Sequence, residues 1–252
     1  TTSCAIPESV PSTIVSAMWA ALAAVALAAG LVSVQRVRAL SVQVAAMAEQ
    51  GSAYTFIIDA GHGGEDGGAS TADGVAESGI NLAVAQRLDA MLVLLGQKTV
   101  MVRTRDEAVY DPGCKTFSEK KVSDLHNRAK LVNETPGAFL ISIHQNQFDE
   151  TKYSGAQVFY NAQEPSRQLA EALQAALAGA LDPGNHRQAK SAQDTVYLMR
   201  AVRAPALLVE CGFLSNPEEA RRLQEPDYQK KLALAIAQTV TDYLQKETEH
   251  EV

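Results

Sequence analysis

Short apolar runs rich in β-branched residues alternate along the chain with longer segments whose apolar positions recur at helical spacing. Six of the short runs are predicted to be strands, at residues 55–60, 98–103, 139–144, 156–160, 195–200 and 206–211. Several of them are apolar at nearly every position, which is typical of strands buried on both faces. The pattern therefore predicts a largely parallel sheet covered by helices.

Helical spacing is clearest where Ile80, Val84, Leu88, Leu92 and Leu95 fall on one face, in a helix expected from about Ser78 to Gly96. Three more helices are predicted, from Ser123 to Val132, from Pro165 to about Ala180, and from Asp227 to Gln245. Strands that alternate with helices predict the α/β class, as a three-layer αβα sandwich with a mostly parallel sheet of about six strands. Three long connections, 104–122, 145–155 and 181–194, are then expected to form the walls of a substrate groove.

The N-terminal part of the chain has a different character. The run from Ile14 to Val34 has no charged residue and matches the roughly 20 residues that span a bilayer. We predict an N-terminal membrane anchor or uncleaved signal at residues 1–35, a juxtamembrane linker at 36–53 and a separate domain at 54–252. Because the run is rich in alanine, a signal-peptide core and a buried helix are the alternatives.

Composition narrows the choice of partners. The formal net charge is -7, and no block of Lys and Arg is long enough to neutralise a run of phosphates. Nucleic acid is therefore not an expected partner. The three cysteines, Cys4, Cys114 and Cys211, are odd in number and widely spaced, so they predict neither a disulfide framework nor a thiolate zinc site.

Chemically useful side chains follow three of the predicted strands. His62 lies in a glycine-rich turn after the first strand, His144 ends the third, and Glu210 lies near the end of the sixth. Ligands of open α/β sheets bind beyond the carboxyl ends of the strands, so these three side chains are expected at one edge.

A catalytic zinc ion takes three His or carboxylate ligands and keeps a fourth position open. His62 and His144 supply two, and Glu77, just before the helix that follows the His62 turn, is the candidate for the third, with Glu65 and Asp66 as rivals by proximity. Each residue also has a simpler reading, as a satisfied polar group at the end of an element. On spacing alone, a metal site and plain structural roles stay open as alternatives.

Seven separated segments add a more specific signal. In chain order they read IIDAGHGGEDGGAS, ESGINLAVAQRLDAML, VRTRDE, LHNRAKLVN, LISIHQN, SGAQVFYN and APALLVECGFLSNPEE. In order and spacing they resemble the zinc-dependent N-acetylmuramoyl-L-alanine amidases of the family 3 type, over about residues 55–245. The last two segments are most similar to the germination-specific amidases, which prepare spore cortex for muramic lactam formation.

The resemblance implies that His62, Glu77 and His144 bind Zn²⁺ and that Glu210 is the catalytic carboxylate. The implied reaction is hydrolysis of the amide between N-acetylmuramic acid and L-alanine in peptidoglycan, with zinc activating a water molecule and Glu210 taking its proton. The alternatives are another zinc hydrolase of wall peptides or sugars, such as a carboxypeptidase or deacetylase, and a non-catalytic peptidoglycan-binding module.

Other polar residues lie in the same motifs. Asp59 is expected either to orient a ligand histidine or to play a plain role at the strand end. From Asn81, Arg103, Arg128 and Asn146 we expect salt bridges and loop hydrogen bonds rather than contacts with stem-peptide carboxylates.

Localisation follows from the implied substrate, which lies on the extracytoplasmic side. Arg36 and Arg38 follow the apolar run and by themselves favour the opposite orientation, and we give the active-site motifs more weight. Because no separate wall-binding segment is visible, targeting is expected from the membrane segment at 14–34 or from an accessory protein.

Overall fold

The computed structural model describes residues 54–192 and 194–250, together with the single positions 19, 30, 32 and 35. Residues 1–49 and 50–252 form two separate units, and the account below concerns the second. The predicted linker at 36–53 and nearly all of the predicted anchor at 14–34 lie outside the described residues. In the part of the chain that is described, no helix has both the length and the apolar character needed to cross a membrane.

The centre of the domain is a sheet of six strands in the order β2-β1-β3-β6-β4-β5. The strands are β1 (Thr55–Ala60), β2 (Lys98–Met101), β3 (Ala138–Asn146), β4 (Gln157–Tyr160), β5 (Lys190–Ser191) and β6 (Ala206–Phe213). All pairings are parallel except that of β4 with β6, which is antiparallel. A mostly parallel sheet of about six strands is thus confirmed.

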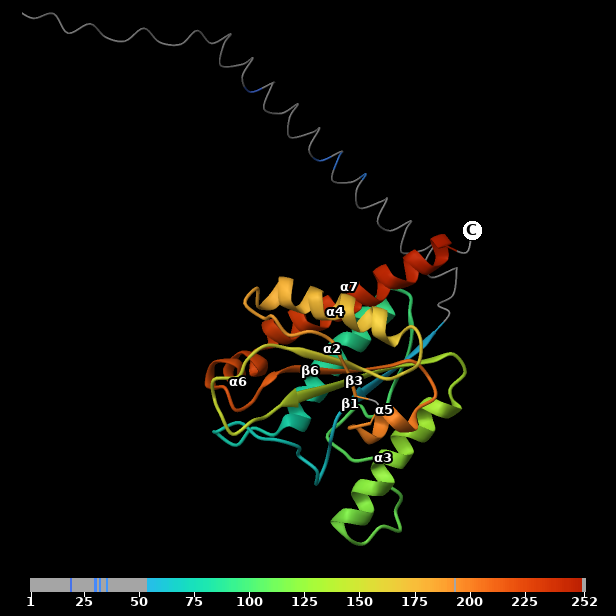
Figure 1. Ribbon diagram of the computed structural model, residues 1–252, viewed down its shortest axis with the longest axis vertical. Coiled ribbons are helices and arrows are strands. Elements are labelled where there is room, and N and C mark those ends of the chain that lie inside the picture. The colour runs from blue at the N-terminus through green and yellow to red at the C-terminus, as the bar shows by residue number, and fades with distance from the viewer. Residues whose placement is uncertain are drawn as a thin grey trace, which may run out of the picture. The chain divides into compact units, whose positions relative to one another are not determined.

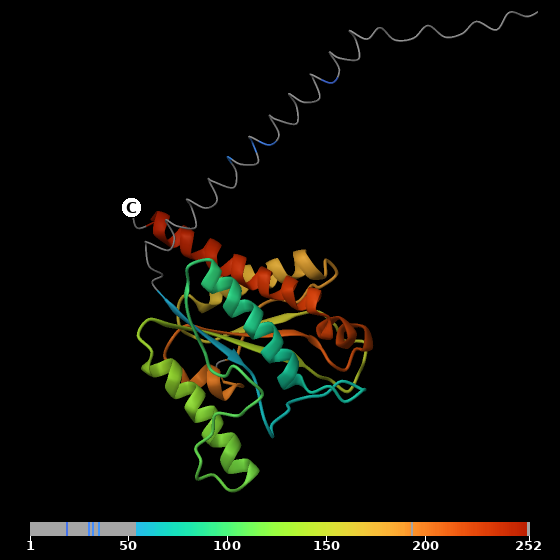
Figure 2. The same cartoon turned by 180° about the vertical axis from the view of Figure 1, so that it is seen from behind.

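Helices cover both faces of the sheet (Figures 1 and 2). On one face, α2 (Glu77–Leu94), α4 (Ser166–Leu181) and α7 (Pro226–His250) pack in a large apolar cluster with alternate strand residues such as Phe56, Ile141 and Val209. On the other face, α3 (Phe117–Glu134) and α5 (Tyr197–Ala201) pack on the intervening residues, such as Ile57 and Leu140. The predicted αβα sandwich is therefore correct.

Helix α3 begins at Phe117, six residues before the predicted cap at Ser123. Thr116 and Glu119 form a capping box, in which the Thr116 side chain accepts from the Glu119 backbone and the Glu119 side chain accepts from the Thr116 backbone. This exchange satisfies two N–H groups of the first turn and fixes the earlier start. The loop before α3 is correspondingly shorter than predicted.

The strand predicted at 195–200 is wrong, because this segment contains the short helix α5. Leu198 and Met199 are buried against α3 and the sheet, and Val202 follows on the same side at helical spacing. The edge strand is instead β5, whose two residues pair with β4. A short run rich in apolar residues does not distinguish a buried strand from a buried helical turn.

One further helix, α6 (Pro217–Gln224), was not predicted. The side chain of Asn216 caps it by accepting from the backbones of Glu218 and Glu219. Within α6, the buried Glu219 accepts hydrogen bonds from the backbones of Gly155 and Phe213. This carboxylate therefore ties the end of β6 to the loop before β4, next to the polar edge of the sheet.

Candidate metal centre

Two histidines and a glutamate meet at the carboxyl edge of the sheet. One ligand atom from each of His62, Glu77 and His144 lies within 4.8 Å of the others. Glu77 bridges the two rings, with Oε1 3.1 Å from Nδ1 of His144 and Oε2 3.4 Å from Nε2 of His62. The structure thus brings together the three residues that the resemblance implies as metal ligands.

Glu77 is the first residue of α2 and is 3% exposed. Its Oε2 accepts from the backbone N–H of Ala69 at 2.9 Å, and its Oε1 accepts from the backbone N–H of Gln145 at 3.0 Å. Burial raises the pKa of this carboxyl, but the hydrogen bond and charge of His144 and the charge of His62 outweigh burial and lower it to about 2. Glu77 is therefore a fixed anion between the two imidazoles.

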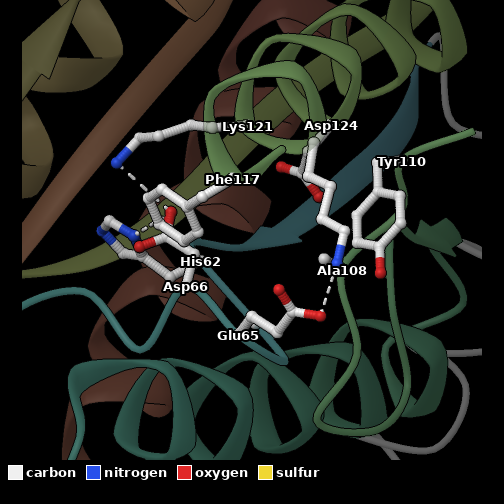
Figure 3. A pocket seen from close by; sticks show the side chains of 10 residues that line it. His62, Glu65, Asp66, Ala108, Tyr110, Phe117, Lys121 and Asp124 are labelled. Carbon is white, nitrogen blue, oxygen red and sulfur yellow. Dashed lines mark hydrogen bonds and ion pairs between the residues drawn. The ribbon is translucent and has the colours of Figure 1, made fainter. Parts of the chain in front are cut away.

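Asp66 contacts the ring of His62 on the side away from Glu77. Its Nδ1 lies 3.0 Å from Oδ2 of Asp66, which in turn is 3.4 Å from Nζ of Lys121 (Figure 3). A carboxylate at Nδ1 favours the tautomer whose Nε2 lone pair is free for a metal. Asp66 thus lies on the far side of the ring from Glu77, while Glu65, the other rival ligand, pairs with Lys120.

The backbone before His62 leaves room for the ring of His144. A Cβ added at Gly61 would lie 2.1 Å from Cε1 and 2.2 Å from Nε2 of His144, closer than any real contact. His62 itself has φ of 61°, a left-handed conformation that is uncommon outside glycine. Gly61 and the left-handed backbone of His62 therefore lie at the place where the rings of His62 and His144 approach each other.

We therefore predict that Gly61→Ala displaces His144 and weakens metal binding by at least about tenfold. The measurement is competition of the purified protein with a chromophoric chelator. Gly79→Ala is the matched control, because a Cβ at this α2 position meets nothing within 4 Å and alanine favours the helix. Equal metal affinity in the two variants would show that His144 does not need the gap at Gly61.

Glu210 lies beside this cluster. It is the register partner of His144 in the pairing of β3 with β6, so the two side chains share one face of the sheet. Its Oε2 is buried and has no hydrogen-bond partner among the described residues. Burial, with a contribution from the charge of Glu77, raises the pKa of Glu210 to about 7 in spite of the opposing charge of His144. The sheet therefore presents a buried carboxyl beside the cluster, with one oxygen free to take part in proton transfer.

Asp59 does not contact the histidines through a hydrogen bond of its own. Its carboxylate pairs with Arg128 and accepts from the hydroxyl of Ser142 at 2.6 Å. Arg128 also donates to the backbone carbonyl of His62 at 2.8 Å. Of the two roles predicted for Asp59, the structure favours the one at the strand end. Asp59 holds Arg128 in place, and Arg128 in turn holds the His62 turn.

Two of the other polar motif residues, Arg103 and Asn81, hold loops as predicted. Arg103 is buried and donates to the carbonyls of Ala60, Gly61 and Ser78. Asn81 donates to Gly61 and to Glu77. Asn146 lies at a register shift between β3 and β6. These contacts surround the cluster and fix the backbone that carries its side chains.

The cluster has the chemistry of a catalytic metal site. Two imidazoles and one carboxylate are a donor set typical of catalytic zinc, in which a fourth position stays open for water or substrate. Glu210 lies beside this cluster as the register neighbour of His144, and its buried Oε2 has no hydrogen-bond partner among the described residues. The residues present therefore fit a metal ion.

Comparisons with known proteins agree with this geometry. A family model described as N-acetylmuramoyl-L-alanine amidase matches residues 56–242. The germination-specific N-acetylmuramoyl-L-alanine amidase of Bacillus subtilis is 37% identical over 193 residues, which are 76% of this chain and 80% of the relative.

Two solved structures extend the similarity to the fold. The CwlD amidase from Clostridioides difficile, in complex with the GerS lipoprotein, matches with a TM-score of 0.73 at 36% identity, over 76% of this chain and 98% of that one. The amidase AmiC2 of Nostoc punctiforme matches with a TM-score of 0.66 at 27% identity, over 77% of this chain and 99% of that one. The resemblance seen in the motifs is confirmed, and the chain belongs to the N-acetylmuramoyl-L-alanine amidase family, whose members hydrolyse an amide bond of peptidoglycan.

Proposed function

We propose that residues 54–252 form a zinc-dependent catalytic domain in which His62, Glu77 and His144 bind the ion and Glu210 is the catalytic base. The observation that carries this proposal is the cluster of one glutamate between two histidines, with the Glu210 carboxyl as its register neighbour. Zinc bound there supplies Lewis-acid chemistry, which activates water and polarises the amide carbonyl between N-acetylmuramic acid and L-alanine.

The chain's own residues then move the proton. Glu210 accepts a proton from the attacking water at Oε2, which has no hydrogen-bond partner among the described residues, and delivers it to the L-alanine nitrogen as the C–N bond breaks. Burial raises the pKa of this carboxyl above its ordinary value, which favours uptake of the proton. Asp66 holds the tautomer of His62 through both steps.

A role in spore cortex is the finer part of the proposal. It is supported by the 37% identity to a relative named as germination-specific and by the match to a CwlD amidase. The same relatives support action on the extracytoplasmic side, where peptidoglycan lies. The proposed anchor at residues 14–34 is supported only by its run without charged residues. The solved CwlD structure contains the GerS lipoprotein, which supports an accessory protein as a partner here as well.

The test is incubation of the zinc-loaded protein with purified peptidoglycan, followed by mass spectrometry of the released products. We expect free stem peptides with an L-alanine amine, lost on chelation and restored by Zn²⁺. Release of shortened stem peptides or of acetate would instead identify a carboxypeptidase or a deacetylase. No release by the zinc-loaded protein from either vegetative wall or spore cortex would favour a binding module.

We also predict that His144→Ala abolishes both zinc binding and hydrolysis. Removal of one of three ligands leaves too few donors for a stable site. His126→Ala is the matched control, because His126 is exposed on α3. Zinc content by atomic absorption and peptide release are measured on the same samples. Full zinc content in His144→Ala would refute the ligand role.

A further inference from the structure

Arg187 lies in the loop between α4 and β5, close to the Glu210 side of the site. Three residues on neighbouring strands form a row across the sheet towards Arg187. His144 on β3 is opposite Glu210 on β6, and Glu210 is opposite Gln157 on β4. Directly opposed residues share a face, so the three side chains line the same surface. Arg187 Nη1 lies 3.4 Å from Oε1 of Gln157, at the end of this row.

The guanidinium of Arg187 is held in place by uncharged groups. Its Nε donates to the carbonyl of Ser154 at 2.9 Å, and its Cζ lies 4.6 Å from the centroid of the Phe213 ring. The Phe213 ring is buried and stacks on Phe148, which is half exposed, at 5.6 Å. An arginine fixed in this way loses little side-chain freedom when it binds a ligand.

The loop that carries Arg187 is fixed as well. The backbone N–H of Arg187 donates to Oδ1 of Asn185, whose Nδ2 donates to the carbonyl of Ala156. Gln157 adds a hydrogen bond to the carbonyl of Gln188. Both flanks of Arg187 are therefore attached to the start of β4.

Within the described residues, no carboxylate forms an ion pair with Arg187. The other arginines near this edge differ, because Arg128 pairs with Asp59 and Asp124, and Arg103 is saturated by backbone carbonyls. Arg187 is also only partly buried. It is a positioned cation with one side still available to a ligand.

The spacing fits the peptide side of the substrate. Adjacent strands are about 4.8 Å apart, so Gln157 lies one strand spacing from Glu210, on the side away from His144. Arg187 lies beyond Gln157 in the same direction. Two extended residues of a stem peptide span about 7 Å. In the stem peptide, L-alanine is followed by an acidic residue joined through its side chain, which leaves its α-carboxyl group free or amidated.

We propose that Arg187 binds the α-carboxylate of the stem-peptide residue that follows L-alanine, so that the enzyme prefers walls in which this group is not amidated. The inference rests on the proposed function, because it places the scissile amide between the metal cluster and Glu210.

The test uses two synthetic stem tripeptides, L-alanyl-γ-D-glutamyl-L-lysine with a free α-carboxylate and the same peptide with a carboxamide there. Calorimetry measures their binding to the zinc-loaded protein, to Arg187→Gln, to Arg187→Lys and to the control Arg167→Gln, which changes an exposed arginine on α4. The ratio of the two affinities in each protein isolates the contribution of Arg187, since contacts with zinc are common to all four proteins.

We expect the wild type and Arg167→Gln to prefer the carboxylate on the order of 10- to 100-fold, the size of a hydrogen bond to a charged group. Arg187→Gln should lose the preference, and Arg187→Lys should keep part of it because the charge remains. No preference in the wild type, or an undiminished preference in Arg187→Gln, would overturn the subsite. Neither result depends on catalysis, so the peptidoglycan assay decides the proposed function separately.

Discussion

Replacing Glu210 with glutamine is expected to lower peptide release by roughly 10²- to 10⁴-fold, the usual contribution of a general acid–base group. Glutamine keeps the shape of the side chain but neither accepts the proton of water nor returns one to the leaving nitrogen. Zinc content and the unfolding curve should stay as in the wild type, because Glu210 lies outside the His–Glu–His cluster and its Oε2 has no partner among the described residues.

Glu171→Gln is the matched control, since Glu171 is an exposed glutamate on α4 that pairs with Arg167. Initial rates on peptidoglycan and metal content are measured for both variants. If Glu210→Gln loses its zinc along with its activity, Glu210 is a ligand rather than a base. If it keeps full activity, the proton passes through another group.

The second large effect is expected from Arg128→Met, which should lower the free energy of unfolding by about 3–5 kcal/mol. Arg128 is 3% exposed and Asp59 is 1% exposed, so the change leaves a buried carboxylate without its cation. Burial raises the pKa of Asp59, but Arg128 and Ser142 outweigh burial and hold it below its ordinary value of 3.8. The pair therefore stabilises the fold fully above pH 3.8, and its contribution is lost as the pH falls further.

Urea denaturation near neutral pH measures this effect. Arg167→Met is the control, because it removes an exposed pair with Glu171 and should change stability little. The additional variant Asp59→Asn, made together with Arg128→Met, should recover part of the loss by removing the unpaired charge. A stability of Arg128→Met equal to that of the control would show that solvent reaches Asp59.

Most of the fold could be predicted from the sequence, because continuous apolar runs mark strands buried on both faces. The failures lie where that signal is short. The run at 195–200 has the same residue types as a strand, and only its packing on α3 shows that it is helical. Two helix starts do carry local sequence signals. Thr116 and Glu119 form the capping box of α3, and Asn216-Pro217 begins α6.

At the site, the positions of residues at strand ends predicted which side chains would lie close together. They did not predict the hydrogen bonds and ion pairs that fix each side chain. Spacing placed His62 and His144 at one edge, and the resemblance to a family selected Glu77 from three acidic residues. The contact of Asp66 with Nδ1 of His62 depends on the left-handed backbone at His62, which no spacing rule gives. Arg187 had no motif at all, since its position depends on a loop folded against β4.

The two edge strands of the sheet affect how readily molecules of the enzyme pair with one another at high concentration. Strand β2 has four residues and includes Lys98, and β5 has only two residues. Short edges offer few unpaired N–H and C=O groups to a strand of another molecule, and an exposed lysine disfavours such pairing further. The domain is thus built to resist edge-to-edge aggregation.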